Sequence, residues 1–341
     1  MPHSDPLREG ERILTICNAC RYCEGYCAVF PAMERLTDFA RADLHYLANL
    51  CHQCGECYYA CPYAPPHEFG VNVPQTLAKI RVESYRAYAW PASAHRVIIF
   101  AAVLAAGLIA VLRGWNTAEP VRGAFYDVVP YQAMVSAFAI VSAFIALALF
   151  AGLVRFWREP APSLAALRGG MRDALTLKYL ASRDSRSRQR FHHCTSYGFL
   201  LCFASTSVAA FYHHALGSPA PYGYLSLPVV LGTAGGLGLL IGPAGLYWLK
   251  RTQDRATADA DARGMEVTFL ALLFFTSLTG LALLAFRNTA AMPPLLYVHL
   301  GIVLALLLTL PYGKFVHAIY RAAALVRYAV EQSNASKLKN G

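Results

Sequence analysis

The 341-residue sequence is poor in charge: 15% of its residues are Asp, Glu, Lys or Arg, whereas 56% are hydrophobic. A soluble globule of this size needs more charge on its surface, so the composition excludes a purely soluble protein and predicts a membrane protein. The first dozen residues lack a hydrophobic leader, which predicts an N-terminus that stays in the cytoplasm. The net charge of +10 does not indicate nucleic-acid binding, because the basic residues occur in bands between apolar runs.

The sequence also lacks a recognisable pair of nucleophile and acid–base residues, and its apolar runs contain few polar residues apart from histidine. The first absence argues against carbon chemistry within this chain, and the second argues against a transport path through the membrane. Cysteine is scarce outside one segment, since eight of the ten cysteines lie between Cys17 and Cys61. Disulfides are disfavoured in a reducing cytoplasm, so this concentration of cysteine predicts metal or cluster ligation.

These eight cysteines form two runs with the spacing C-x2-C-x2-C-x3-C. The spacing is typical of [4Fe–4S] clusters, in which three thiolates of a run hold one cluster and the fourth serves the other cluster. The sequence therefore predicts two clusters with crossed ligation. The first would be held by Cys17, Cys20, Cys23 and Cys61. The second would be held by Cys51, Cys54, Cys57 and Cys27. A zinc site, which usually uses CxxC pairs, fits two complete four-cysteine runs less well, as does a disulfide framework.

The hydrophobic pattern predicts an all-α protein. Together with the cysteine runs above and the histidines below, it predicts an α-helical double [4Fe–4S] ferredoxin domain followed by a six-helix transmembrane haem b bundle. The expected parts are a cytoplasmic ferredoxin-like domain (1–75), an amphipathic connector (76–93), the membrane domain (94–322) and a cytoplasmic tail (323–341). Each predicted span is long enough to cross about 30 Å of hydrocarbon. The spans are expected at 95–112, 131–154, 194–216, 225–249, 266–286 and 295–320.

The charges between the predicted spans indicate their orientation. Segments 155–190 and 250–263 and the residues after 320 are rich in Arg and Lys, whereas the alternate loops are nearly free of them. Basic loops stay on the cytoplasmic side, so both termini are predicted to be cytoplasmic in a multi-pass protein of the bacterial inner membrane. The glycine-rich run 232–238 in the fourth span predicts close helix packing, because no strand precedes it as a dinucleotide site would require.

Histidine is rare in membrane spans and is usually functional there. The third predicted span begins with His192-His193 and ends with His213-His214. The sixth contains His299 and His317, whose separation of 18 residues equals five turns of a helix, so both are expected on one face of that span. Because the two spans run in opposite directions, His192 or His193 is expected at the depth of His317 on the cytoplasmic side, and His213 or His214 at the depth of His299 on the far side. Two such pairs are what two bis-histidine haems b require. The sequence is consistent with one haem or two, and with either member of each adjacent pair as ligand.

The two cysteine-rich strings, CNACRYCEGYC (17–27) and CHQCGECYYACPYAPPHEF (51–69), resemble those of the TcuB/CitB family, the tricarballylate or citrate utilisation proteins B, and the C-terminal part of CobZ. The resemblance covers nearly the whole chain. It implies a ferredoxin part of the α-helical type found in succinate dehydrogenase iron–sulfur subunits. It also implies a subunit that accepts electrons from a TcuA-like FAD-dependent dehydrogenase, which oxidises tricarballylate to cis-aconitate, and passes them through the clusters and haem b to the quinone pool.

Two other functions are consistent with the same residues. A quinol-dependent subunit would use the same cofactors in the opposite direction and deliver electrons to a soluble reductase. A membrane sensor or transporter would hold the clusters without catalytic flux, although the scarcity of polar residues in the spans argues against transport. Redox potentials distinguish the two directions of electron flow, because electrons move toward the higher potential.

Overall fold

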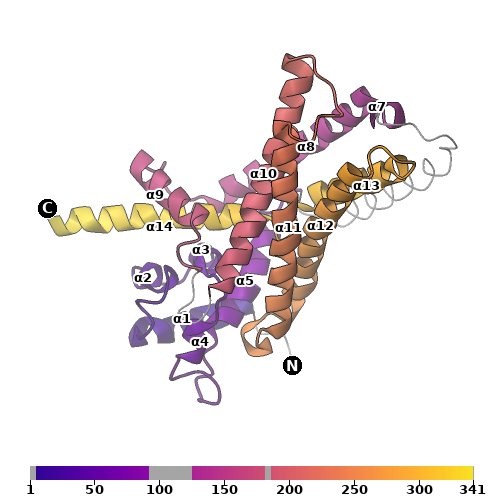
Figure 1. The fold of residues 1–341 in the computed structure, drawn as a ribbon. Helices are drawn as coiled ribbons and strands as arrows, with labels where there is room; N and C mark the ends of the chain where they lie inside the picture. Colours follow the sequence, from indigo (N-terminus) through magenta and orange to yellow (C-terminus); the bar gives the residue numbers. More distant parts are fainter. Residues whose placement is uncertain (1–4, 92–124, 181–185, 341) are drawn as a thin grey trace.

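The computed structural model describes residues 5–91, 125–180 and 186–340, and every regular element in these ranges is a helix. The all-α prediction is therefore confirmed for this part of the chain. The helices form an N-terminal domain and a set of long apolar helices that pack against it (Figure 1). The first predicted span, 95–112, lies outside the described residues.

The N-terminal domain is built from helices whose starts are marked by side-chain caps. Asp5 accepts a hydrogen bond from the backbone N–H of Leu7, and Asn72 accepts one from that of Gln75. These caps fix the starts of the helices Pro6–Cys20 and Val73–Tyr88. The two helices contact each other and the helix Arg41–Leu50. In chain order the helices are α1 (Pro6–Cys20), α2 (Val29–Met33), α3 (Arg41–Leu50), α4 (Glu56–Tyr59) and α5 (Val73–Tyr88).

The core of this domain lies between α1, α3 and α5. Ile13 of α1, Leu47 of α3 and Ile80 of α5 are completely or almost completely buried there. The sequence predicted that residues 76–93 form a connector outside the ferredoxin part. The structure instead packs α5 into the domain core, because one side of this helix is lined with buried residues such as Leu77.

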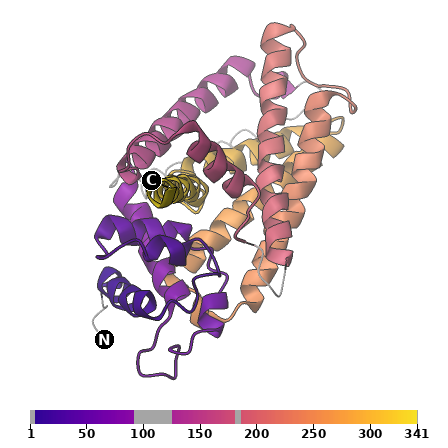
Figure 2. The same ribbon diagram turned by 90° about the vertical axis from the view of Figure 1, so that its left-hand side faces the viewer.

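The C-terminal helix α14 (Val316–Asn340) belongs to the same core. It contacts α3, α9 (Leu164–Leu175) and α8 (Tyr131–Phe156), and its residues Ala324 and Leu325 are buried among N-terminal side chains. Figure 2 looks along α14 and shows it between the N-terminal helices and α9. The predicted cytoplasmic tail, 323–341, is therefore a packed helix over its described residues, because its apolar face covers the N-terminal domain.

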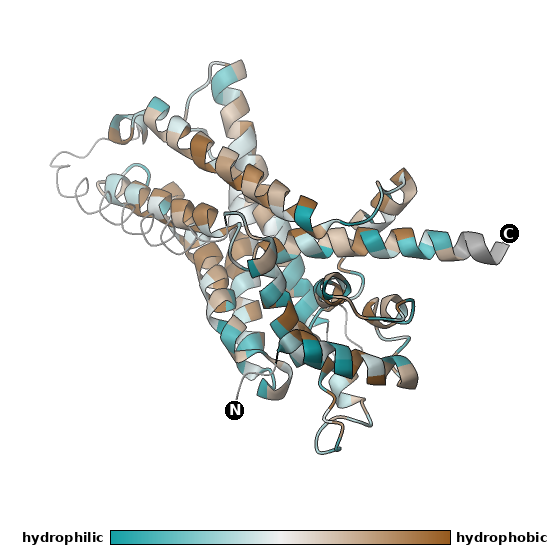
Figure 3. Cartoon of the chain, turned by 180° about the vertical axis from the view of Figure 1, so that it is seen from behind, coloured by the Kyte–Doolittle hydropathy of each residue, from teal (hydrophilic) through white to brown (hydrophobic). Residues whose placement is uncertain are grey.

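Among the residues that the structure describes, five helices are long and apolar enough to cross a membrane, so the chain is a membrane protein. Large apolar side chains such as Phe150, Phe203 and Trp248 are exposed on them, as contact with lipid requires. Hydrophilic residues are concentrated in the N-terminal domain and along α14 (Figure 3). A short helix, α7 (Phe125–Val128), precedes the first of the five. The five helices are α8, α10 (Ser187–Ala215), α11 (Leu227–Thr252), α12 (Ala260–Ala285) and α13 (Met292–Thr309).

Glycine brings α10 and α11 into close contact. A Cβ atom placed on Gly235 of α11 would lie 2.8 Å from the backbone nitrogen of Cys202 of α10, and one on Gly198 would lie 2.9 Å from the carbonyl oxygen of Gly235. No side chain larger than glycine fits these positions without moving a backbone. The prediction that the glycine-rich run packs helices closely is confirmed.

The sixth predicted span is not one helix. α13 ends at Thr309 and α14 begins at Val316, with turns between them. Pro311 cannot continue the hydrogen-bond ladder, and a Cβ atom on Gly313 would lie 2.9 Å from the carbonyl oxygen of Thr309. The inference that His299 and His317 share one helix face is therefore wrong, because it required a continuous helix over 295–320.

Candidate functional site

The first cysteine group gathers where α1 ends. Cys17 and Cys20 lie in the last turn of α1, and Cys23 lies in the loop after it. The helix stops there because Arg21 adopts a left-handed conformation, with φ of 54°, and donates its N–H to the carbonyl of Cys17. Cys61 reaches this loop from beyond α4. The thiol of Cys17 interacts electrostatically with those of Cys61, Cys23 and Cys20, so the structure brings together the four residues predicted for the first cluster.

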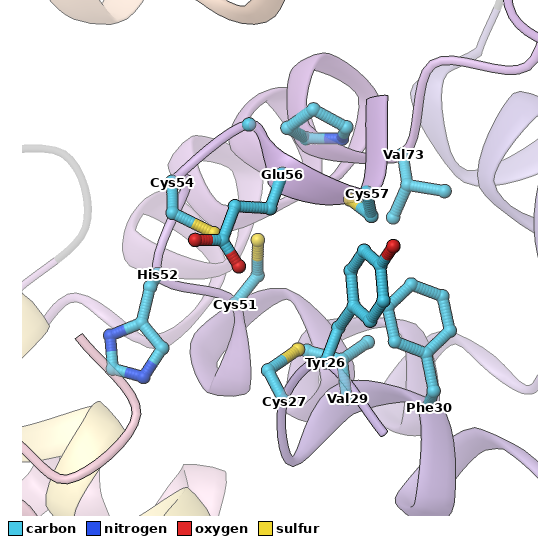
Figure 4. A pocket seen from close by; sticks show the side chains of 12 residues that line it. Tyr26, Cys27, Val29, Phe30, Cys51, His52, Cys54, Glu56, Cys57 and Val73 are labelled. Carbon is cyan, nitrogen blue, oxygen red and sulfur yellow. The ribbon is translucent and has the colours of Figure 1, made fainter. Parts of the chain in front are cut away.

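The second group gathers around the turn between α3 and α4. Cys51 caps α3, and Cys57 lies within α4. Between them Cys54 precedes Gly55, whose φ of 87° makes the sharp turn possible. The thiol of Cys57 interacts electrostatically with those of Cys51, Cys27 and Cys54. The four side chains surround a cavity of about 20 Å³ (Figure 4), which is the crossed grouping that the spacing predicted.

This donor set fits iron–sulfur clusters better than single metal ions. Over the described part of the chain, no three His, Cys, Asp or Glu side chains come close enough together to hold one metal ion. Four thiolates on a tetrahedral zinc would all lie about 2.3 Å from it. In a [4Fe–4S] cube each thiolate binds a different iron, so the four sulfurs stand farther apart. Two groups of four thiols are the donor sets that two such cubes would need.

Burial and neighbouring thiols favour the protonated form of these cysteines. Burial, with a contribution from Cys61, raises the pKa of Cys17 to about 12. Burial, with a contribution from Cys51, raises the pKa of Cys27 to about 12. The thiolate is the form that binds metals, so ligation must release these protons. The positive charge of iron would supply the attraction that favours the thiolates.

Two buried arginines hold the loop that carries Cys51. Arg81 of α5 donates hydrogen bonds to the carbonyls of Ala48 and Cys51, at 2.8 and 2.6 Å. Arg321 of α14 donates one to the carbonyl of Leu50, at 2.8 Å. The two arginines are 3% and 6% exposed. The end of α3 is thereby fixed from two sides, and its terminal carbonyls gain the charged donors that a helix end favours.

A third arginine reaches the same loop from the membrane helices. Arg188 of α10 donates a hydrogen bond to the carbonyl of Gln53, at 2.7 Å. None of the three guanidinium groups has a carboxylate within 4.0 Å among the residues that the structure describes. Burial, together with the nearby charge of Arg81, lowers the pKa of Arg321 to about 9. Because buried cations need counter-charges, the negative charge of a thiolate-bound cluster fits this environment.

Two of the predicted haem histidines lie beside this loop. His52, which follows Cys51, contacts the guanidinium group of Arg321. His317 of α14 interacts electrostatically with His192 of α10, and His192 also interacts with His52. The Nδ1 atom of His317 is buried and has no hydrogen-bond partner in the described ranges. The structure therefore brings His192 and His317 together next to the second cysteine group.

The surroundings of His192 carry an excess of positive charge. Arg188 and Lys314 both interact with its ring. The carboxylate of Glu266 of α12 lies 2.6 Å from the ammonium group of Lys314 and also bonds to that of Lys250. Burial lowers the pKa of Lys314 to about 8. One carboxylate shared by two ammonium groups leaves net positive charge, which fits the two propionates of a haem b.

The histidines expected on the other side of the membrane face different helices. The ring of His213 stacks on Tyr131 of α8, with centroids 3.8 Å apart, and His214 bonds to the hydroxyl of Tyr131 at 2.6 Å. His299 of α13 instead lies against α12, with its Nδ1 3.0 Å from the hydroxyl of Thr279. No hydrogen bond or ring contact within the described ranges joins His299 to His213 or His214. The second histidine pair therefore stays a prediction.

Sequence reasoning missed the buried cations around the second cysteine group, although the pattern contains a signal. Arg81 lies one turn from the buried residues Leu77 and Tyr85 on the apolar side of α5. Arg321 lies one turn from His317 and from the buried Leu325 on α14. A charged residue on an otherwise apolar helix face is costly unless it has a buried partner. A buried arginine in such a position therefore indicates that an anion or backbone carbonyls must lie nearby to bind it.

Comparison with known proteins agrees with this site. The family model described as Citrate utilization protein B matches residues 91–337, and that described as Citrate utilization protein B Fer4-like domain matches residues 10–87. A relative from Escherichia coli, named Citrate utilization protein B, is 45% identical over 354 aligned positions, covering 96% of this chain and 93% of the relative. No solved structure matches. The Fer4-like match indicates iron–sulfur binding and an electron-transfer role for the N-terminal domain. The chain belongs to the citrate utilization protein B family, as its two cysteine-rich strings predicted.

Proposed function

We propose that this chain is the membrane electron-transfer subunit of a dehydrogenase system. It accepts electrons from a partner FAD-dependent dehydrogenase of the tricarballylate dehydrogenase type and delivers them, through two [4Fe–4S] clusters and haem b, to the membrane quinone pool. When bound, these cofactors supply one-electron redox chemistry. The observation that carries the proposal is the loop 51–54, which joins the second cysteine group to the helices of His192 and His317.

The exposure of the two cysteine groups supports an order between them. Cys20 of the first group is exposed, and the neighbouring Tyr22 is 62% exposed. Cys51 of the second group is buried, and the backbone on either side of it accepts hydrogen bonds from Arg188 of α10 and Arg321 of α14. We infer that the first group faces the partner dehydrogenase and the second faces the membrane helices.

We assign the cluster ligands as the crossed sets of four cysteines, and the haem on the cluster side to His192 and His317. His193, whose ring stacks on Tyr197 and whose Nδ1 is buried without a partner in the described residues, is the alternative to His192. For a second haem the candidate ligands are His213, His214 and His299. The N-terminal domain is assigned to the cytoplasmic side of the bacterial inner membrane, because basic residues flank α10 and the end of α11 there.

Replacing Arg188 with glutamine should lower the midpoint potential of the second cluster by tens of millivolts. The reduced cluster carries one more negative charge than the oxidised one, so a nearby cation stabilises it. Arg188→Lys should restore most of the potential, since it keeps the charge. Arg190→Gln, on an exposed position two residues along, is the matched control. Redox titration followed by electron paramagnetic resonance measures these potentials, and equal values in all variants would contradict the charge assignment.

The direction of electron flow is tested by following reoxidation after partial reduction. The purified protein is reduced anaerobically in proteoliposomes with a limiting amount of dithionite, and a short-chain quinone is then added. Rapid reoxidation of haem absorbance, with cluster potentials below the haem potential, is the expected result. Cluster potentials above that of the quinone, together with reduction of the oxidised protein by quinol, would support the reverse flow instead. If the protein exchanged electrons with neither quinone nor quinol, the result would contradict the electron-transfer proposal and favour a sensor role.

A further inference from the structure

A second cavity lies away from the cysteine and histidine groups, at the turn between α11 and α12. Its volume is about 380 Å³. Tyr247 and Arg251 are one turn apart on α11, and Arg263 and Val267 are one turn apart on α12. The cavity therefore lies between the facing sides of two membrane helices, at the end where the chain joins them. Its lining residues are Tyr247, Arg251, Gln253, Arg255, Arg263 and Val267.

The lining of this cavity has three positive charges and no negative one. In the described part of the chain, no carboxylate lies within 4.0 Å of the guanidinium groups of Arg251, Arg255 or Arg263. Lys250 differs from them, because it points away from the cavity to form an ion pair with Glu266. The three arginines are thus left to bind an anion from outside the chain.

The acidic residues of the same turn are engaged elsewhere. Asp254 accepts a hydrogen bond from the backbone N–H of Ala256, and Asp259 accepts one from that of Asp261. Asp254 caps the short helical turn Arg255–Thr257 and Asp259 caps the start of α12, a role that orients both carboxylates toward backbone N–H groups. They shape the turn and do not line the cavity.

The depth of the cavity matches the headgroup layer of a membrane. Two candidate spans, α11 and α12, meet here. Trp248 is 60% exposed and Tyr247 41% exposed in the last turns of α11. Exposed Trp and Tyr at the end of a span are typical of the membrane–water interface, where phosphates of lipid headgroups lie.

We propose that this cavity binds the anionic headgroup of a phospholipid. Guanidinium groups form paired hydrogen bonds with phosphate oxygens, and a site between two spans gives the acyl chains access to lipid. Tyr247 adds a hydroxyl, and Gln253, whose amide nitrogen donates to the hydroxyl of Thr257, adds its amide oxygen for the rest of the headgroup. The inference does not depend on the proposed electron-transfer function.

A lipid bound here would also stabilise the turn between α11 and α12, which the N-terminal domain contacts. The amide of Asn72 donates to the carbonyl of Ala256 at 2.8 Å, and that of Gln75 donates to the carbonyl of Ala258 at 3.3 Å. Both carbonyls belong to the turn that carries Arg255. Holding this turn in place therefore holds the surface on which the N-terminal domain rests.

The test measures thermal unfolding of the full-length protein in nanodiscs of phosphatidylcholine alone, or with phosphatidylglycerol or cardiolipin added. The expected result is a higher unfolding temperature with either anionic lipid, and no increase when inorganic phosphate is added to phosphatidylcholine discs. The variant Arg251→Gln/Arg255→Gln/Arg263→Gln should lose the increase. The variant Arg158→Gln/Arg168→Gln/Arg190→Gln makes the same change of net charge at exposed positions outside the cavity and should keep it.

An increase of equal size in the cavity variant would overturn the proposal, as would its loss in the control variant, which would indicate general surface attraction. An increase caused by inorganic phosphate would indicate a free-anion site. Iron content and unfolding in phosphatidylcholine discs show whether the triple variant is folded. If it is not, Arg263→Gln is compared with Arg190→Gln by native mass spectrometry of co-purified lipid, where loss of anionic lipid is expected only for Arg263→Gln.

Discussion

Replacing Cys61 with alanine is expected to remove the same cluster that Cys20→Ala removes, and to leave the other cluster in place. Cys61 is far from Cys20 in sequence, yet both thiols interact with that of Cys17. A [4Fe–4S] cube that loses one of its four thiolates loses a bond that holds it, so about half of the cluster iron should disappear in each variant. Iron analysis and electron paramagnetic resonance of the reduced protein would show the same remaining signal in both.

Cys27→Ala provides the matched comparison, because its cysteine ends the first run as Cys61 ends the second. With crossed ligation, Cys27→Ala leaves the signal that Cys54→Ala leaves, and that signal differs from the one in Cys61→Ala. With each run holding its own cluster, Cys27→Ala would instead match Cys20→Ala. That second outcome would overturn the ligand sets assigned to both clusters.

Replacing His192 or His317 with alanine is expected to abolish the haem on the cluster side. Each variant removes an imidazole that is assigned as an axial ligand of that haem. Ferrous haem b absorbance should fall by about half if two haems are bound and disappear if one is bound, while the cluster signals persist. The double variant should lose no more haem than either single variant, because both histidines serve the same iron.

His193→Ala is the control for this assignment, since it removes the adjacent imidazole from the same turn of α10. It should keep its haem. Haem loss in His193→Ala with full haem in His192→Ala would transfer the ligand role to His193. Full haem content in both His192→Ala and His317→Ala would show that this pair does not bind haem.

The local parts of the site were predictable from sequence because their determinants lie close together in the chain. The spacing of the cysteine runs limits which thiols can share a cluster, and the structure groups them accordingly. The run of apolar residues predicted the second to fifth spans to within several residues at either end. Pro311 and Gly313 lie at the break in the sixth span. The span was predicted as continuous because apolar residues lie on both sides of them.

The rest depends on contacts between residues far apart in the chain. α14 has the composition of a polar tail, and only its packing against α3 shows that its apolar face belongs to the N-terminal core. The grouping of Arg81, Arg188 and Arg321 around one loop likewise joins three helices that no local pattern connects. Sequence likewise could not show which histidines lie near each other. Helical periodicity predicts the face of a helix on which a residue lies, but not which neighbouring helix that face contacts.

The most direct test of the electron-relay function is the amount of iron, acid-labile sulfide, haem and zinc bound per chain of the purified protein. Two [4Fe–4S] clusters require about eight sulfides and about eight non-haem irons per chain, and the membrane helices are expected to add at least one haem b. Stoichiometric zinc without sulfide, or sulfide without any haem, would contradict a relay from the N-terminal thiols to the membrane.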